Sequence, residues 1–132
     1  MELVISSNFM LLSNIWSIYH YLPYNDIEKV LSTLYFMNYI CSTLFWINPN
    51  EHNIIHKIDG IIAKISFLLF SIYGIIIQKN LLFFIYTILS LYFFHNSAYF
   101  SKIKWCSNDH IYNHFMFHIF ISIGTTYIFK KE

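Results

Sequence analysis

The stretch "GIIAKISFLLFSIYGIIIQKNLLFFIYTILSLYFF", residues 60–94, decides the fold class. It holds two long apolar blocks that are separated only by the polar triplet at 78–80. Each block, with its flanks, approaches the roughly 20 residues that an α-helix needs to cross the hydrocarbon core of a bilayer. Long apolar blocks with short polar breaks are typical of membrane spans and not of the core of a soluble protein. We therefore predict an integral, multi-pass membrane protein.

The composition of the whole chain supports this prediction. The 132 residues are 57% hydrophobic, 21% aromatic and 11% charged, and soluble domains carry roughly 25% charged residues. The formal net charge is +1, so the charge balance does not indicate a nucleic-acid partner. The start "MELVISSNFM" lacks the positive residues and the cleavage site of a signal peptide. The length fits a single domain, 1–132, and the two cysteines, Cys41 and Cys106, have no metal or redox spacing.

Outward from the opening stretch, apolar blocks and turn signals predict five helices. The expected ranges are 3–22, 29–47, 56–77, 81–100 and 109–129. "PYNDIEK" joins the first two helices, and Asn48-Pro49 ends the second. The triplet at 78–80 is short enough to make 56–77 and 81–100 an antiparallel hairpin, and Ser107, Asn108 or Asp109 can cap the last helix. The expected fold is all-α, an integral membrane bundle of about five transmembrane helices.

Polar side chains gather at one end of this predicted bundle. Three histidines recur every fourth residue in 109–129, and alternation of the spans brings other polar residues to the same face. The set of interest is Ser42, His56, Asp59, His110, His114 and His118. Ionisable groups below the headgroups are costly and usually face the bundle interior. Two histidines one helical turn apart are a common way to hold zinc, and interhelical hydrogen bonding is the alternative. His110 is interpreted as interfacial, and Lys64, within 56–77, as snorkelling to the near interface.

These motifs resemble a known family. "HFMFHIFISIGTTYIF", residues 114–129, is similar to the last helix of the CREST superfamily, which includes alkaline ceramidases and the PAQR receptors. "CSTLFW" at 41–46 resembles the Ser-x3-His motif of the family's second helix, and "HKIDGI" at 56–61 resembles the opening of its third helix. The start "MELVISSNFM" is a looser match to the ceramidase N-terminus.

The resemblance implies a zinc centre that hydrolyses a lipid amide. In the family, three histidines hold the metal, one from the second helix and two from the last, and the metal lowers the pKa of its bound water. Carried over, His114 and His118 would be metal ligands, Asp59 would orient the water and Ser42 would belong to the site. The family's helix-two histidine is Trp46 here, and indole does not ligate zinc. The family also has seven spans, and loss of two between the third and the last would keep the last helix entering from the same face.

Three alternatives follow from Trp46. His56 or His52 supplies the third ligand from the start of the third helix, or the site holds metal weakly, or it is inactive. Trp46 itself, at a span end, is interpreted as an interface anchor. The first functional hypothesis is therefore a zinc-dependent hydrolase of a membrane lipid amide, with His114, His118 and His56 on the metal and Asp59 and Ser42 in catalysis.

The alternative function is a degenerate relative with a receptor, lipid-binding or structural role, and its partner would again be membrane lipid. A proton or ion pathway through the histidines is a third class of function, but it leaves the ordered motifs unexplained.

Overall fold

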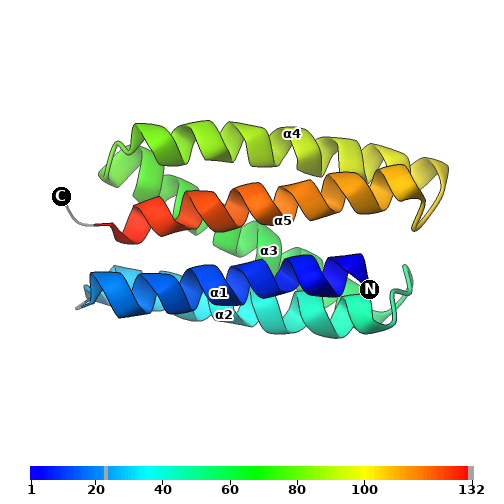
Figure 1. Cartoon of the computed structure of the whole chain (residues 1–132), viewed down its shortest axis with the longest axis horizontal. Coiled ribbons are helices and arrows are strands. Elements are labelled where there is room, and N and C mark those ends of the chain that lie inside the picture. Colours follow the sequence, from blue (N-terminus) through cyan, green and yellow to red (C-terminus); the bar gives the residue numbers. More distant parts are fainter. Residues whose placement is uncertain (23, 131–132) are drawn as a thin grey trace.

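The computed structural model describes residues 1–22 and 24–130, and over these ranges the protein is an all-α bundle of five helices (Figure 1). They are α1 (Glu2–Tyr21), α2 (Asp26–Ile47), α3 (Ile54–Ser71) continued by the π-helix η1 (Ile72–Ile77), α4 (Leu81–Ile103) and α5 (Asn108–Phe129). The predicted fold class is confirmed, and all the predicted helix ends agree with the structure within three residues. Pro23, in the predicted first turn, and the terminal 131–132 lie outside the described residues.

The observed start of α2 differs from the predicted start, position 29. The side chain of Asn25 accepts a hydrogen bond from the backbone N–H of Glu28 at 2.8 Å, and the Glu28 carboxylate accepts from the backbone N–H of Asn25 at 2.9 Å. This reciprocal capping box satisfies two N–H groups that the first helical turn leaves without partners. The helix therefore begins at Asp26, three residues before the predicted position.

The helices pack as two connected pairs with α3 on one side. α5 packs along α4 and α1, α1 packs along α2, and α2 packs along α3 (Figure 1). α3 does not pack along α4, and the segment meets α4 at η1 instead. The predicted hairpin of 56–77 with 81–100 is therefore wrong about packing, although the short connection is correct. A short loop fixes which helices are consecutive, but it does not force them to lie together over their full length.

The turn between η1 and α4 explains where these two helices meet. A Cβ at Gly74 would overlap the ring of Phe83, so only glycine permits this close approach. The side-chain amides of Gln78 and Asn80 donate to the backbone carbonyls of Ile128 and Tyr127 at 2.8 Å and 3.0 Å. The turn thus caps the end of α5, whose last carbonyls have no partner within the helix.

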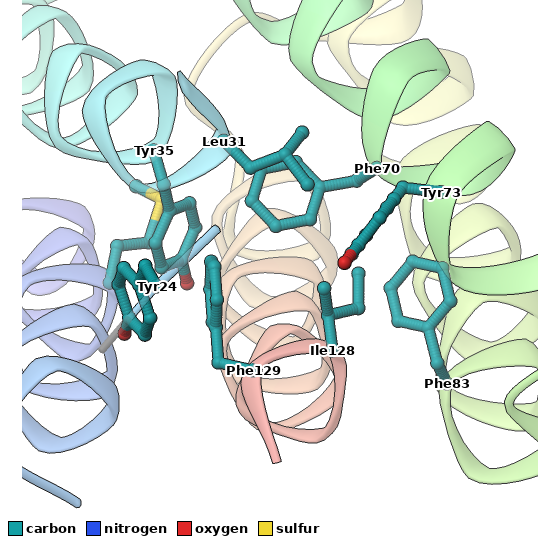
Figure 2. Close-up of a cluster of buried hydrophobic side chains, with 9 residues drawn as sticks. Tyr24, Leu31, Tyr35, Phe70, Tyr73, Phe83, Ile128 and Phe129 are labelled. Carbon is teal, nitrogen blue, oxygen red and sulfur yellow. The ribbon is translucent and has the colours of Figure 1, made fainter. Parts of the chain in front are cut away.

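Buried apolar side chains form two clusters. The larger lies at the end of the bundle where α1 finishes and α5 ends, and it is mainly aromatic (Figure 2). Its buried members are Met10, Tyr24, Leu31, Tyr35, Phe70, Tyr73, Phe83, Ile128 and Phe129. The smaller cluster, at the opposite end, contains Leu3, Phe45 and Trp46. The polar candidate residues lie beside this smaller cluster.

The bundle is polar inside and apolar outside between these clusters. Ser6, Ser7 and Ser90 are fully buried, whereas large apolar side chains, mainly leucine and isoleucine, are exposed on the outer surfaces of α1, α2, α3 and α4. Soluble proteins show the opposite distribution. In a bilayer, buried hydroxyls join helices and the lipid solvates the apolar exterior.

Three helical segments are long and apolar enough to cross a membrane, among the residues described. They are Asp26–Ile47, Ile54–Ile77 and Leu81–Ile103. α1 and α5 have 20 and 22 residues, and the serines, asparagines and histidines that lower their hydropathy lie mostly on their buried faces. The protein is therefore a membrane protein, and crossing by all five helices stays a prediction.

Candidate functional site

The histidine stripe begins at the connection between α4 and α5. Ser107 caps α5 by accepting from the backbone N–H of His110, as one of the three predicted capping residues. The backbone N–H of Cys106, which has φ 55°, donates to Nδ1 of His110 at 3.1 Å. An Nδ1 that accepts leaves the ring proton on Nε2 when the imidazole is neutral. His110 is 3% exposed, because the loop folds over it and uses it as a cap, and its interfacial depth in the membrane stays a prediction.

His114 and His118 lie together, as their spacing predicts. Their ring centroids are 4.7 Å apart. Nδ1 of His118 is hydrogen-bonded to the hydroxyl of Ser6 on α1 at 2.7 Å, and Nδ1 of His114 to the hydroxyl of Ser97 on α4 at 3.1 Å. If each Nδ1 carries the proton, each Nε2 keeps a free lone pair, which is how metal-bound histidines are usually oriented.

Ser42 reaches this pair indirectly. Its hydroxyl is 2.9 Å from the hydroxyl of Ser7, which follows Ser6 in α1. The hydroxyls of Ser6 and Ser7 both donate to the backbone carbonyl of Leu3, so Ser42, Ser7, Ser6 and His118 form one buried polar group that joins α2, α1 and α5. Neither Ser6 nor Ser97 was among the site residues predicted from the sequence. Neither has a local signal, because each serine is identified only by a partner on another helix.

Trp46 occupies the place at which the resemblance requires a histidine. Its ring centroid is 4.9 Å from that of His114, and its ring stacks at 6.3 Å on Trp105 from the α4–α5 connection. Only 5% of Trp46 is exposed, so its interpretation as an interface anchor was wrong. Trp105 and α5 cover Trp46, although the sequence shows only that Trp46 lies at the end of a span.

No hydrogen bond or ring contact between described residues joins His56 or Asp59 to the histidine pair, although His56 acts electrostatically on His114. The His56 ring packs against Phe45 at 4.6 Å and against Trp105 at 5.5 Å. Asp59 is half-buried, acts electrostatically on Cys41 of α2, and has no hydrogen bond to the described residues. No group of three or more His, Cys, Asp or Glu side chains in 1–22 and 24–130 is arranged to hold a metal ion. Zinc sites use at least three protein ligands, so the described residues do not form a complete zinc site. Zinc binding by this chain therefore stays a prediction.

A groove lies between α1 and α5, beginning one residue beyond His118 along α5. Its volume is about 400 Å³ and its lining is almost entirely apolar. The hydroxyl of Ser13 in its lining donates to the backbone carbonyl of Ser122 at 2.9 Å. The lining residues are Phe9, Leu12, Ser13, Trp16, Ile119, Ser122, Ile123 and Thr126. The groove opens on the apolar exterior of the bundle.

The two cysteines are separate free thiols. Burial raises the pKa of the Cys106 thiol, and the N-terminal amino group opposes this change only in part. A thiol with a raised pKa is protonated at neutral pH and is a poor nucleophile and metal ligand. The structure therefore gives Cys106 no chemistry beyond packing.

Comparison with known proteins finds no matching protein-family model, no similar curated protein and no similar solved structure. The resemblance to the CREST superfamily accordingly stays a prediction from the sequence motifs.

Proposed function

We propose that this chain is a catalytically degenerate membrane protein of the CREST-like type, which binds membrane lipid and does not hydrolyse it. The observation that carries the proposal is the indole of Trp46, 4.9 Å from the ring of His114. Indole has an N–H donor and no lone pair for a metal. The His114–His118 pair therefore lacks the third imidazole that the resemblance requires.

The polar groups around the pair support a structural role. Ser6 joins His118 to α1, Ser97 joins His114 to α4, and Ser42 joins α2 to α1. Interhelical hydrogen bonds of this kind hold membrane helices together, each contributing about 0.6 kcal/mol. The residues of the expected site thus serve as links between four helices.

The groove between α1 and α5 supports lipid binding. It is apolar, has a volume of about 400 Å³ and opens toward the bilayer side of the bundle. Sites for apolar ligands are concave, mostly apolar, and carry a few polar groups. A hydrocarbon chain fits this description, and the Ser13 and Thr126 hydroxyls are the polar groups in the lining.

Metal analysis of the purified protein tests the degenerate site. We expect little zinc in the unaltered chain, whereas Trp46→His should acquire about one zinc per chain because it places a third imidazole beside the pair. Leu44→His is the matched control and should stay zinc-free, since Leu44 is an exposed residue of the same helix. About one zinc per unaltered chain, removed by His114→Ala with His118→Ala, would overturn the proposal.

Lipid retention tests the second half of the proposal. Leu12→Trp and Ile123→Trp together should fill the groove, and mass spectrometry of the detergent-purified protein should then detect less bound lipid. The control Leu44→Trp alters an exposed position outside the groove. Equal lipid retention in both variants would show that the groove is not a lipid site.

A specific observation favours a second candidate, a zinc-dependent hydrolase of a lipid amide. Ser6 and Ser97 are hydrogen-bonded to the two Nδ1 atoms, and with the proton on each Nδ1 the Nε2 atoms of His114 and His118 are in the form that binds metals. His56 would have to move from Phe45 and Trp105 to complete the ligands. In that case His56→Ala would lose zinc, and the unaltered chain would release fatty acid from an N-acyl sphingoid lipid.

A further inference from the structure

The groove between α1 and α5 follows a constant register between the two helices. α1 and α5 pack side by side and finish at the same end of the bundle (Figure 1). The hydrogen bonds between them join positions that are 109 to 112 residues apart in the chain. The groove keeps this register from its inner end, at Phe9 and Ile119, to its outer end, at Trp16 and Thr126. Residues of one helix therefore predict which residues of the other lie at the same depth.

His20 and Lys130 continue the two sides of the groove by one helical turn. His20 lies four residues after Trp16, and their ring centroids are 3.8 Å apart. Lys130, the C-cap residue of α5, lies four residues after Thr126. Side chains four residues apart share a face of a helix. Both side chains are exposed, so an imidazole and an ammonium group, both hydrogen-bond donors, stand at the outer end of the groove.

The carboxylates described at this end of the bundle already have partners. Asp26 pairs with Lys29 at 2.8 Å. Glu28 is 3% exposed and accepts from the hydroxyl of Tyr73, on the side of α2 that faces η1. In 1–22 and 24–130, Lys130 forms no ion pair. Its charge is therefore available to an anionic group that lies at the membrane surface.

The length of the groove matches one leaflet of a bilayer. From Phe9 to His20 the helix rises about 16 Å at 1.5 Å per residue, which is close to half of a hydrocarbon core of about 30 Å. At the inner end the rings of Phe9 and Phe115 meet edge to face, 6.4 Å between centroids, and bridge α1 and α5. A hydrocarbon chain that starts at the level of His20 therefore ends near the middle of the bilayer.

We propose that the groove holds an acyl chain of an anionic phospholipid from the leaflet at this end, with the lipid phosphate bound by Lys130 and His20. A lysine ammonium binds phosphate as a point charge, and basic residues at the membrane surface attract anionic lipids. The inference rests on the proposed lipid-binding function and on the crossing of the membrane by α1 and α5. It adds the class of headgroup and the leaflet from which the lipid comes.

Competition between two lipids with identical acyl chains tests the headgroup. The protein is reconstituted with equal amounts of phosphatidylglycerol and phosphatidylcholine and extracted in mild detergent, and native mass spectrometry measures the lipids that it retains. The unaltered chain should favour phosphatidylglycerol about fivefold, the factor expected for one lysine near an anionic surface. Lys130→Gln should bring the ratio close to one without lowering the total lipid, because the groove still holds the chain. Lys130→Arg should keep the preference.

Lys79→Gln is the matched control for charge at this end of the bundle. Lys79 is exposed in the turn before α4 and does not line the groove, so the preference should persist. Equal effects of Lys79→Gln and Lys130→Gln would show a general attraction of lipid to positive charge and would overturn the assignment of the phosphate to Lys130.

The total lipid and the lipid ratio separate this inference from the proposed function. If filling the groove with Leu12→Trp and Ile123→Trp leaves the total lipid unchanged, the groove is not a lipid site and both proposals fail. If the filled groove loses lipid but the unaltered chain retains the two lipids equally, the groove binds lipid and only the headgroup assignment is wrong.

Discussion

Among single residues, Ser6 and His118 show how a buried imidazole is accommodated in this bundle. Ser6 is fully buried, His118 is 3% exposed, and the serine hydroxyl lies 2.7 Å from Nδ1. A buried polar atom without a partner destabilises a fold by about 1–3 kcal/mol. Ser6 therefore contributes to stability mainly by giving Nδ1 of His118 a hydrogen-bond partner, and less by its own packing.

Ser6→Ala should lower the free energy of unfolding by about 1–2 kcal/mol, because it leaves Nδ1 of His118 without a partner. The measurement is unfolding in detergent with increasing SDS. Ser101→Ala is the control, since that hydroxyl bonds only to the carbonyl of Ala98 in its own helix. Equal effects of the two changes would mean that the Ser6–His118 contact contributes no stability.

Lys79 gives a second prediction for a single residue. Its φ of 53° lies in the left-handed region, which is unfavourable for residues with a Cβ. Lys79→Gly should stabilise the protein by about 0.5–1 kcal/mol, while Lys102→Gly, in the last turn of α4, should destabilise it by a similar amount. Thermal unfolding of both variants checks the opposite signs, and a loss of stability in Lys79→Gly would contradict the argument.

The helices of this bundle are joined at specific points and not along uniform interfaces. η1 approaches α4 through Gly74 and Phe83, whereas α3 before it contacts α2 and leaves Gly60 open. The π-helix lies at this junction, where Tyr73 also donates from its hydroxyl to Glu28 at 3.2 Å. Two glycines of the same segment thus have opposite environments.

The two glycines should respond differently to alanine. Gly74→Ala should destabilise the protein by about 1–3 kcal/mol, because the new methyl group overlaps the Phe83 ring. Gly60→Ala should be neutral or stabilise by up to about 1 kcal/mol, since alanine is the better helix former and has room. Denaturation of monomeric protein in detergent is the measurement. If Gly74→Ala leaves the free energy of unfolding unchanged, η1 lies farther from α4 than in this structure.

For the whole molecule, the arrangement of polar and apolar residues indicates a membrane environment. The start of α1 and the end of α5 lie at opposite ends of the bundle, as an odd number of alternating crossings requires (Figure 1). α1 and α5 place polar residues inward, against each other and against their neighbours. This arrangement predicts that they cross the membrane together with the three more apolar segments.

Labelling from the two sides of sealed vesicles tests the five crossings. In a chain with Cys41→Ala and Cys106→Ala, single cysteines at Glu2→Cys and Lys130→Cys should react with an impermeant maleimide from opposite sides. The division of lysines between the two faces predicts the cytoplasmic side for position 130. Reaction of both cysteines from one side would require an even number of crossings and would exclude the five-span topology.

The sequence alone determined the helical class, the number of helices and nearly all their ends. Lipid offers no hydrogen bonds to the backbone, so each long apolar block must form a helix wherever it packs. The polar breaks therefore located the turns, and Ser107 was among the predicted caps. The start of α2 and the end of α4 each differ from the prediction by three residues, and at α2 the unread local signal is the Asn25–Glu28 capping box.

Only the tertiary structure decided which polar groups meet. The i, i+4 spacing predicted that His114 and His118 would adjoin, but it did not predict their serine partners, the burial of Trp46, or the packing of His56 against Phe45 and Trp105. These contacts depend on the rotation of each helix about its axis and on how the α4–α5 connection folds over the bundle end. Residues distant in the chain determine the helix rotations and the fold of this connection. The reason is that helix association in a bilayer is governed by close packing and specific hydrogen bonds.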